Sequence, residues 1–86
     1  MKKRKIKQPK VELIYTGLKE NEIYTFFTIK RDIVRVFFGG LLSTSDEKAF
    51  EVLEKIMKKG FIFKSGERAG IAYYKIKERW TNKTEF

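Results

Sequence analysis

The 86-residue sequence contains no cysteine and no histidine. Their absence excludes disulfides, thiolate nucleophiles, imidazole bases and the usual zinc ligands. The six glycines also form neither a phosphate-binding loop nor a dinucleotide-binding turn. We therefore expect a protein that is not an enzyme, that holds no cofactor or metal and that has no small-molecule substrate.

Long apolar runs are absent as well. The longest, Val36–Leu42, contains two glycines and is far shorter than the roughly 20 residues that cross a bilayer. The basic start of the chain is followed by Val11 and Glu12, not by the apolar stretch of a secretory signal. We expect a soluble protein without membrane contacts, located in the cytoplasm or in a virion.

Positive charge is concentrated at the N-terminus. Residues 1–10 hold six basic side chains and no acidic one, in a chain of net charge +9. Such a run repels itself and favours an anionic partner. The partner is either nucleic acid or an acidic protein surface. The predicted contacts in this basic N-terminal arm are Lys2, Lys3, Arg4, Lys5, Lys7 and Lys10.

Three β-strands are predicted in the first half of the chain, where β-branched and aromatic residues cluster. Their ranges are Val11–Thr16, Ile23–Ile29 and Ile33–Phe38. Lys30-Arg31-Asp32 has the length of a hairpin connection between the last two. Alternation in the third strand places Arg35 and Phe37 on a mixed face, which either contacts a partner or is covered by the chain's own termini.

A helix is predicted after Gly39-Gly40. Thr44-Ser45-Asp46-Glu47 matches the capping box, in which the first hydroxyl and the last carboxylate each bond a backbone amide. Apolar residues then recur at three- and four-residue spacing up to Gly60, which ends the helix. Acidic residues near its start and lysines near its end fit the helix dipole and need no catalytic explanation.

A second hairpin is predicted from Phe61–Lys64 and Gly70–Lys77. In its last strand Ala72, Tyr74 and Ile76 should point inward. The turn between the strands also fits the wing of a winged fold, but a winged helix-turn-helix needs more helices than the one expected here.

The segment Tyr73–Trp80 alternates aromatic and basic residues, a pattern typical of proteins that bind single-stranded nucleic acid. A half-buried edge strand is the alternative explanation. The predicted anion contacts in this segment are Lys75, Lys77 and Arg79. The predicted interaction surface comprises Arg35, Phe37, Tyr73 and Trp80.

The fold class that follows is α+β: an antiparallel sheet of about five strands in the order β-β-β-α-β-β, with one helix on one face. Residues 1–10 form the basic N-terminal arm, residues 11–77 a single domain and residues 78–86 a polar C-terminal tail. One helix cannot cover both faces of such a sheet. The uncovered face should therefore be polar, curled into a partial barrel or buried by another subunit.

The run Val34–Gly40, with Thr44–Glu47, Leu53 and Gly60-Phe61, resembles a pattern in small accessory and virion structural proteins of tailed bacteriophages. In that pattern a strand ending in an apolar residue and glycine leads through a threonine and an acidic pair into a short helix. The resemblance implies a non-enzymatic virion or neck component.

Two functions compete on these grounds. The first is a structural or interaction module, viral in origin, whose basic arm and exposed sheet face dock on other protein subunits. The second is a sequence-nonspecific nucleic-acid-binding protein that uses the arm and the Tyr73–Trp80 segment. An inhibitor of an enzyme fits less well, because protein mimics of DNA are usually acidic.

Overall fold

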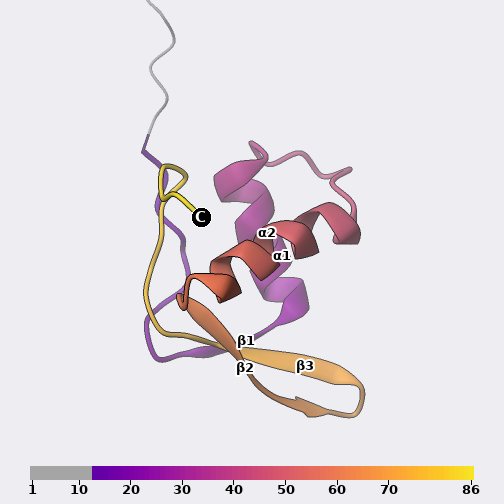
Figure 1. The fold of residues 1–86 in the computed structure, drawn as a ribbon. Coiled ribbons are helices and arrows are strands. Elements are labelled where there is room, and N and C mark those ends of the chain that lie inside the picture. Colours follow the sequence, from indigo (N-terminus) through magenta and orange to yellow (C-terminus); the bar gives the residue numbers. More distant parts are fainter. Residues whose placement is uncertain (1–12) are drawn as a thin grey trace, which may run out of the picture.

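The computed structural model in Figure 1 describes residues 13–86. These residues form an α+β fold, as predicted, but with three strands and two helices in place of five strands and one helix. None of these helices is long and apolar enough to span a membrane. The elements are β1 (Ile23–Thr25), α1 (Phe26–Phe37), α2 (Asp46–Lys58), β2 (Ile62–Arg68) and β3 (Ile71–Ile76).

Residues 26–37 form helix α1, so the predicted strands Ile23–Ile29 and Ile33–Phe38 are wrong beyond Thr25. Thr25 begins the helix, because its side chain accepts a hydrogen bond from the backbone N–H of Thr28. The strands were predicted because this segment is rich in β-branched and aromatic residues. However, Ile29, Ile33 and Val36 recur at helical spacing, and all three are buried in the core. Burial of this stripe outweighs the weak strand propensity.

Helix α2 begins at Asp46, and the residue that caps it differs from the prediction. The hydroxyl of Ser45 accepts the N–H of Lys48 at 3.2 Å, whereas the hydroxyl of Thr44 donates to the carbonyl of Leu41 at 2.7 Å. The predicted capping box of Thr44 and Glu47 is therefore wrong. The predicted end of the helix is confirmed, since Gly60 has a φ of 83°, which suits glycine best.

The sheet has the strand order β1-β3-β2, and both pairs are antiparallel. Strands β2 and β3 form the predicted second hairpin, but its turn is misplaced in the prediction: residues 65–68, expected between the strands, belong to β2, and the turn lies at Ala69-Gly70. The inward set predicted for β3 is confirmed at Tyr74 and Ile76, which are buried, while Ala72 is half-buried. Because Tyr74 and Ile76 share one core with residues of α1 and α2, both helices lie on the inner face of the sheet.

The segments before β1 and after β3 pair with each other. Thr16 donates its N–H to the carbonyl of Trp80, and Asn82 donates to Ile14, both at 2.9 Å. A single antiparallel bridge joins Tyr15 to Thr81. The predicted strand Val11–Thr16 is therefore wrong over residues 13–16. Val11 and Glu12 of that predicted strand lie outside the described residues.

Residues 78–86 are packed against the rest of the domain. Trp80 is only 1% exposed and belongs to the hydrophobic core. The ring of Phe86 contacts Phe37 and Phe61 edge-on, with centroid distances of 5.9 and 5.4 Å. The polar tail expected from composition is thus part of the folded body.

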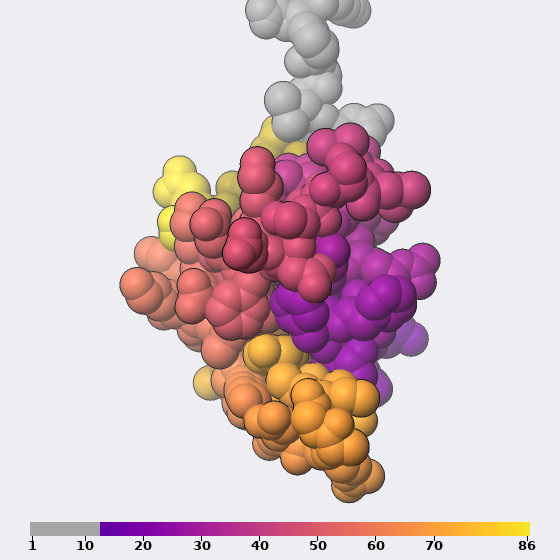
Figure 2. Space-filling model, turned by 90° about the vertical axis from the view of Figure 1, so that its right-hand side faces the viewer, coloured from indigo at the N-terminus to yellow at the C-terminus, as the bar shows by residue number. Residues whose placement is uncertain are grey.

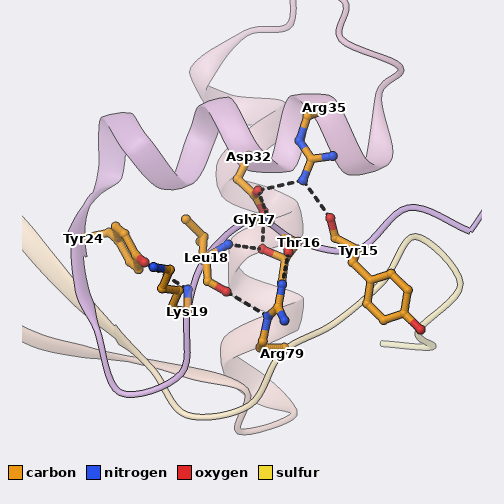
Figure 3. Close-up of polar contacts among 9 residues, drawn as sticks. All are labelled: Tyr15, Thr16, Gly17, Leu18, Lys19, Tyr24, Asp32, Arg35 and Arg79. Carbon is orange, nitrogen blue, oxygen red and sulfur yellow. Dashed lines mark hydrogen bonds and ion pairs between the residues drawn. The ribbon is translucent and has the colours of Figure 1, made fainter.

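The buried carboxylate of Asp32 ties α1 to the segment before β1 (Figure 3). It accepts hydrogen bonds from the hydroxyl of Thr16 at 2.5 Å and the N–H of Gly17 at 2.7 Å. The guanidinium of Arg35 lies 3.2 Å from the same carboxylate and also donates to the carbonyl of Tyr15 at 2.7 Å. Three donors therefore converge on one carboxylate that is largely removed from water.

Arg79 holds the same segment from the other side. Its guanidinium donates to the carbonyls of Thr16 at 2.5 Å and Leu18 at 3.0 Å. Residues 16–18 are thereby clamped between α1 and the chain that follows β3 (Figure 3).

We expect Asp32→Ala to lower the free energy of unfolding by about 2–4 kcal/mol, because three donors lose their acceptor. Urea denaturation followed by circular dichroism measures this change. The control is Glu54→Ala, since Glu54 is exposed on α2 and should change stability by less than about 0.5 kcal/mol. Equal stability of the two variants would contradict a structural role for the Asp32 carboxylate.

Candidate nucleic-acid interface

The outer face of the sheet carries aromatic, aliphatic and basic side chains in one row. Lys75 on the central strand pairs with Ile23 on one side and Phe63 on the other. Cross-strand partners project to the same face of a sheet, so these three side chains lie side by side. Phe63 is 46% exposed and Ile23 is 51% exposed, which leaves apolar surface in contact with water.

Tyr73 lies in the next row of the same face. Its partners are Thr25 on β1 and Gly66 on β2, and the latter brings no side chain against the tyrosine ring. The β-bulge between Lys64 and Gly66 lies at this point. A shallow hollow of about 370 Å³ opens here. Its lining residues are Ile23, Ser65, Gly66, Glu67, Arg68 and Tyr73.

The charges around this hollow are mainly positive. Arg68 lines it directly, and Lys75 lies in the neighbouring row. Glu67 also lines the hollow, but its carboxylate lies 3.2 Å from the ammonium of Lys64, and this exposed pair offsets its charge. Among the described residues no ion pair involves Arg68 or Lys75. Both cations are thus available to an anionic ligand.

Of the predicted site residues, the structure groups Tyr73 and Lys75 on this face, and the exposed Lys77 follows directly after β3. We call Phe63, Arg68, Tyr73 and Lys75 the aromatic-basic face. The contacts predicted in the basic N-terminal arm lie outside the described residues.

The other predicted site residues serve the fold. The guanidinium groups of Arg35 and Arg79 bond to backbone carbonyls of the segment before β1. Phe37 is half-buried against Phe86, and Trp80 is buried in the core. These four side chains do not add to the aromatic-basic face, and the strand alternation that placed Arg35 with Phe37 does not apply in a helix.

Sequence reasoning missed Phe63 and Arg68. Both lie on β2, whose outward residues follow only from its register with β3. The bulge shifts that register, so simple alternation along β2 does not place Arg68 opposite Ile71. Phe63 was detectable, because it lies in the predicted strand Phe61–Lys64, where alternation places it on the face opposite Ile62.

The described residues offer no group of acidic side chains arranged to hold a metal ion. Comparison of the chain with protein-family models, with curated proteins and with solved structures finds no match. The function is therefore argued from the surface chemistry.

The two adjacent tyrosines of β3 test the assignment of its faces. We expect Tyr74→Ala to lower the free energy of unfolding by about 3–5 kcal/mol, because it leaves a cavity in the core. Tyr73→Ala should cost less than about 2 kcal/mol, since the half-buried ring lies on the outer face. Urea denaturation measures both. A larger loss for Tyr73→Ala would mean that the faces are assigned the wrong way round.

Proposed function

We propose that the protein is a non-enzymatic, sequence-nonspecific nucleic-acid-binding module that uses the aromatic-basic face together with the basic N-terminal arm. The observation that supports this proposal is the presence of Phe63 and Tyr73 beside Lys75 and Arg68 on one uncovered sheet face. Single-stranded nucleic acid binds such surfaces by stacking its bases on aromatic rings and by placing its phosphates near cations.

The arrangement of elements bears on the choice between single strands and duplex. A strand, two helices and a hairpin follow one another in the order known from winged helix-turn-helix proteins. One helix was expected from sequence, and that number counted against this fold, whereas the described residues form two. The likeness is an analogy of fold order and carries no function by itself.

Charge on α2 argues against docking in the duplex major groove. In helix-turn-helix proteins the second helix enters that groove with its N-terminal residues against the bases. Here the first turns of α2 present the exposed carboxylates of Asp46, Glu47 and Glu51 against one exposed lysine of the same turns, Lys48, and Lys30, which pairs with Asp46. These carboxylates repel phosphates, which leaves the aromatic-basic face as the better surface for nucleic acid.

The aromatic side chains should contribute affinity for single strands. We expect Phe63→Ala and Tyr73→Ala each to weaken binding of fluorescent oligo(dT), about 20 nucleotides long, by about 5- to 150-fold, which corresponds to about 1–3 kcal/mol per stacked base. Fluorescence anisotropy at fixed salt measures this loss.

The matched control is Leu42→Ala, which removes a side chain that is 94% exposed in the link between the helices, away from the sheet. This variant should bind within about twofold of the parent, as expected for a surface change off the binding face. If both aromatic variants bind as tightly as the control, stacking on this face is not the binding mode.

The arm should contribute through its charges. Each phosphate contact in single-stranded nucleic acid contributes about 0.7 to the slope of log K against log salt concentration. Removal of residues 1–10, which hold six basic side chains, should therefore flatten this slope by up to about 4 and weaken binding at low salt. An unchanged slope would exclude the arm from phosphate contact.

A structural or assembly role among protein subunits, as in a virion, is the second candidate function. The resemblance to phage accessory proteins motivated it, although the segment Val34–Phe37 that should be a strand is the end of α1. The observation that favours a protein partner is an apolar groove where the start of α1, the first turns of α2 and the beginning of β3 meet.

A further inference from the structure

A groove of about 1030 Å³ lies where the N-terminal ends of both helices meet the hairpin. The start of α1, the first turns of α2 and the beginning of β3 form its walls. Figure 2 shows this side of the molecule, with the start of α2 above the hairpin. Three of its lining residues are large, apolar and exposed, namely Phe27 (67%), Phe50 (40%) and Ile71 (47%).

These apolar residues form one surface. The ring of Phe50 lies 6.1 Å from that of Phe26, which also lines the groove, so the aromatic wall continues from α2 to α1. Single exposed apolar residues are normal on a protein surface, but several around one groove are typical of an interaction site. The groove therefore fits a partner with at least one large apolar side chain.

The charged residues that line the groove are acidic, in a chain of net charge +9, and the cation beside its aromatic wall is Arg31, 6.0 Å from the ring of Phe27. Asp46, Glu47 and Glu51 form the acidic rim of the groove, and only Asp46 has a cationic partner, Lys30 at 2.5 Å. Glu47 and Glu51 have no ion-pair partner among the described residues. They stand four residues apart on one helix, where like charges repel each other. A cationic partner would relieve this repulsion.

We propose that this groove binds the N-terminal segment of a second copy of the chain. Residues 2–7 of the sequence are Lys-Lys-Arg-Lys-Ile-Lys, so one apolar side chain, Ile6, stands between basic ones. The isoleucine is complementary to the apolar groove, and the basic residues are complementary to its acidic rim. Reciprocal exchange of the segments between two copies would close a symmetric dimer.

The position of the described N-terminus favours exchange between copies over docking within one copy. Leu13, where the described chain begins, precedes the pairing of Ile14 with Asn82. In Figure 1 the described chain begins at the end of the molecule away from the hairpin turn, whereas the groove borders Gly70 and Ile71 next to that turn. A segment that enters from a second copy does not have to run along its own domain to reach the groove.

The experiment is size-exclusion chromatography with light scattering over a range of protein concentrations, without nucleic acid. At about 0.1 M salt, where charges at contact are only partly screened, we expect a mass above the 10.2 kDa of one chain. Removal of residues 1–10, and separately the double change Glu47→Lys with Glu51→Lys, should each weaken self-association at least tenfold. The control Glu54→Lys with Glu85→Lys makes the same change in charge at exposed positions outside the groove and should associate like the parent.

Mixing the two deficient chains tests exchange between copies directly. The truncated chain retains an intact groove, and the Glu47→Lys, Glu51→Lys chain retains the segment, so the mixture should form a heterodimer although neither chain associates alone. A parent that is monomeric at every concentration, association that survives either change, or a mixture that stays monomeric would overturn the proposal. Circular dichroism of each variant shows that loss of association is not loss of folding.

This inference does not depend on the proposed binding of nucleic acid, and an experiment can contradict either proposal without contradicting the other. Tyr73→Ala should self-associate like the parent, because Tyr73 does not line the groove. Its loss of oligo(dT) binding is measured in a different assay.

Discussion

The carboxylate of Asp32 is the interaction on which the rest of the structure depends. It lies on α1 but bonds the segment before β1, and Arg79 holds that segment from the opposite side. The two contacts join the segment before β1 to α1 and to the chain after β3, in which Trp80 is buried in the core. A domain of this size buries only about 60% of the surface of its unfolded chain. The apolar surface that its terminal segments add to the core is therefore important for stability. The helices pack on the inner face of the sheet, so neither helix covers its outer face.

The hairpin and α2 were predictable from sequence because local signals agree there. Alternation places Tyr74 inward, Gly60 ends a regular apolar stripe, and glycines between two β-rich runs indicate a hairpin, although its turn lies at Ala69-Gly70 and not at residues 65–68. Helix α1 was missed because its residues are β-branched and aromatic, while the helical spacing of Ile29 and Ile33 carries the opposite signal. Composition and periodicity conflict in this segment, and the energy of burying the stripe decides the conflict. The clamp on residues 16–18 joins positions far apart in the chain, which no local pattern reveals.

The surface divides into regions of opposite chemistry. The aromatic-basic face presents cations beside aromatic rings, whereas the groove presents carboxylates beside phenylalanines. Tyr73 and Lys75 of the aromatic-basic face were predictable from sequence, since both alternate with core residues on one strand. The groove was not predictable, because its walls come from three separate elements. The same basic arm complements both anionic nucleic acid and the acidic rim, so binding and self-association draw on one set of charges.

The central claim is that single-stranded nucleic acid binds the outer face of the sheet. The most direct measurement is an NMR titration of isotope-labelled protein with oligo(dT), followed through backbone amide and aromatic signals. We expect the largest changes at Phe63, Tyr73 and Lys75, with little change along α2. Changes confined to α2 and the groove, or no changes beyond residues 1–12, would contradict it.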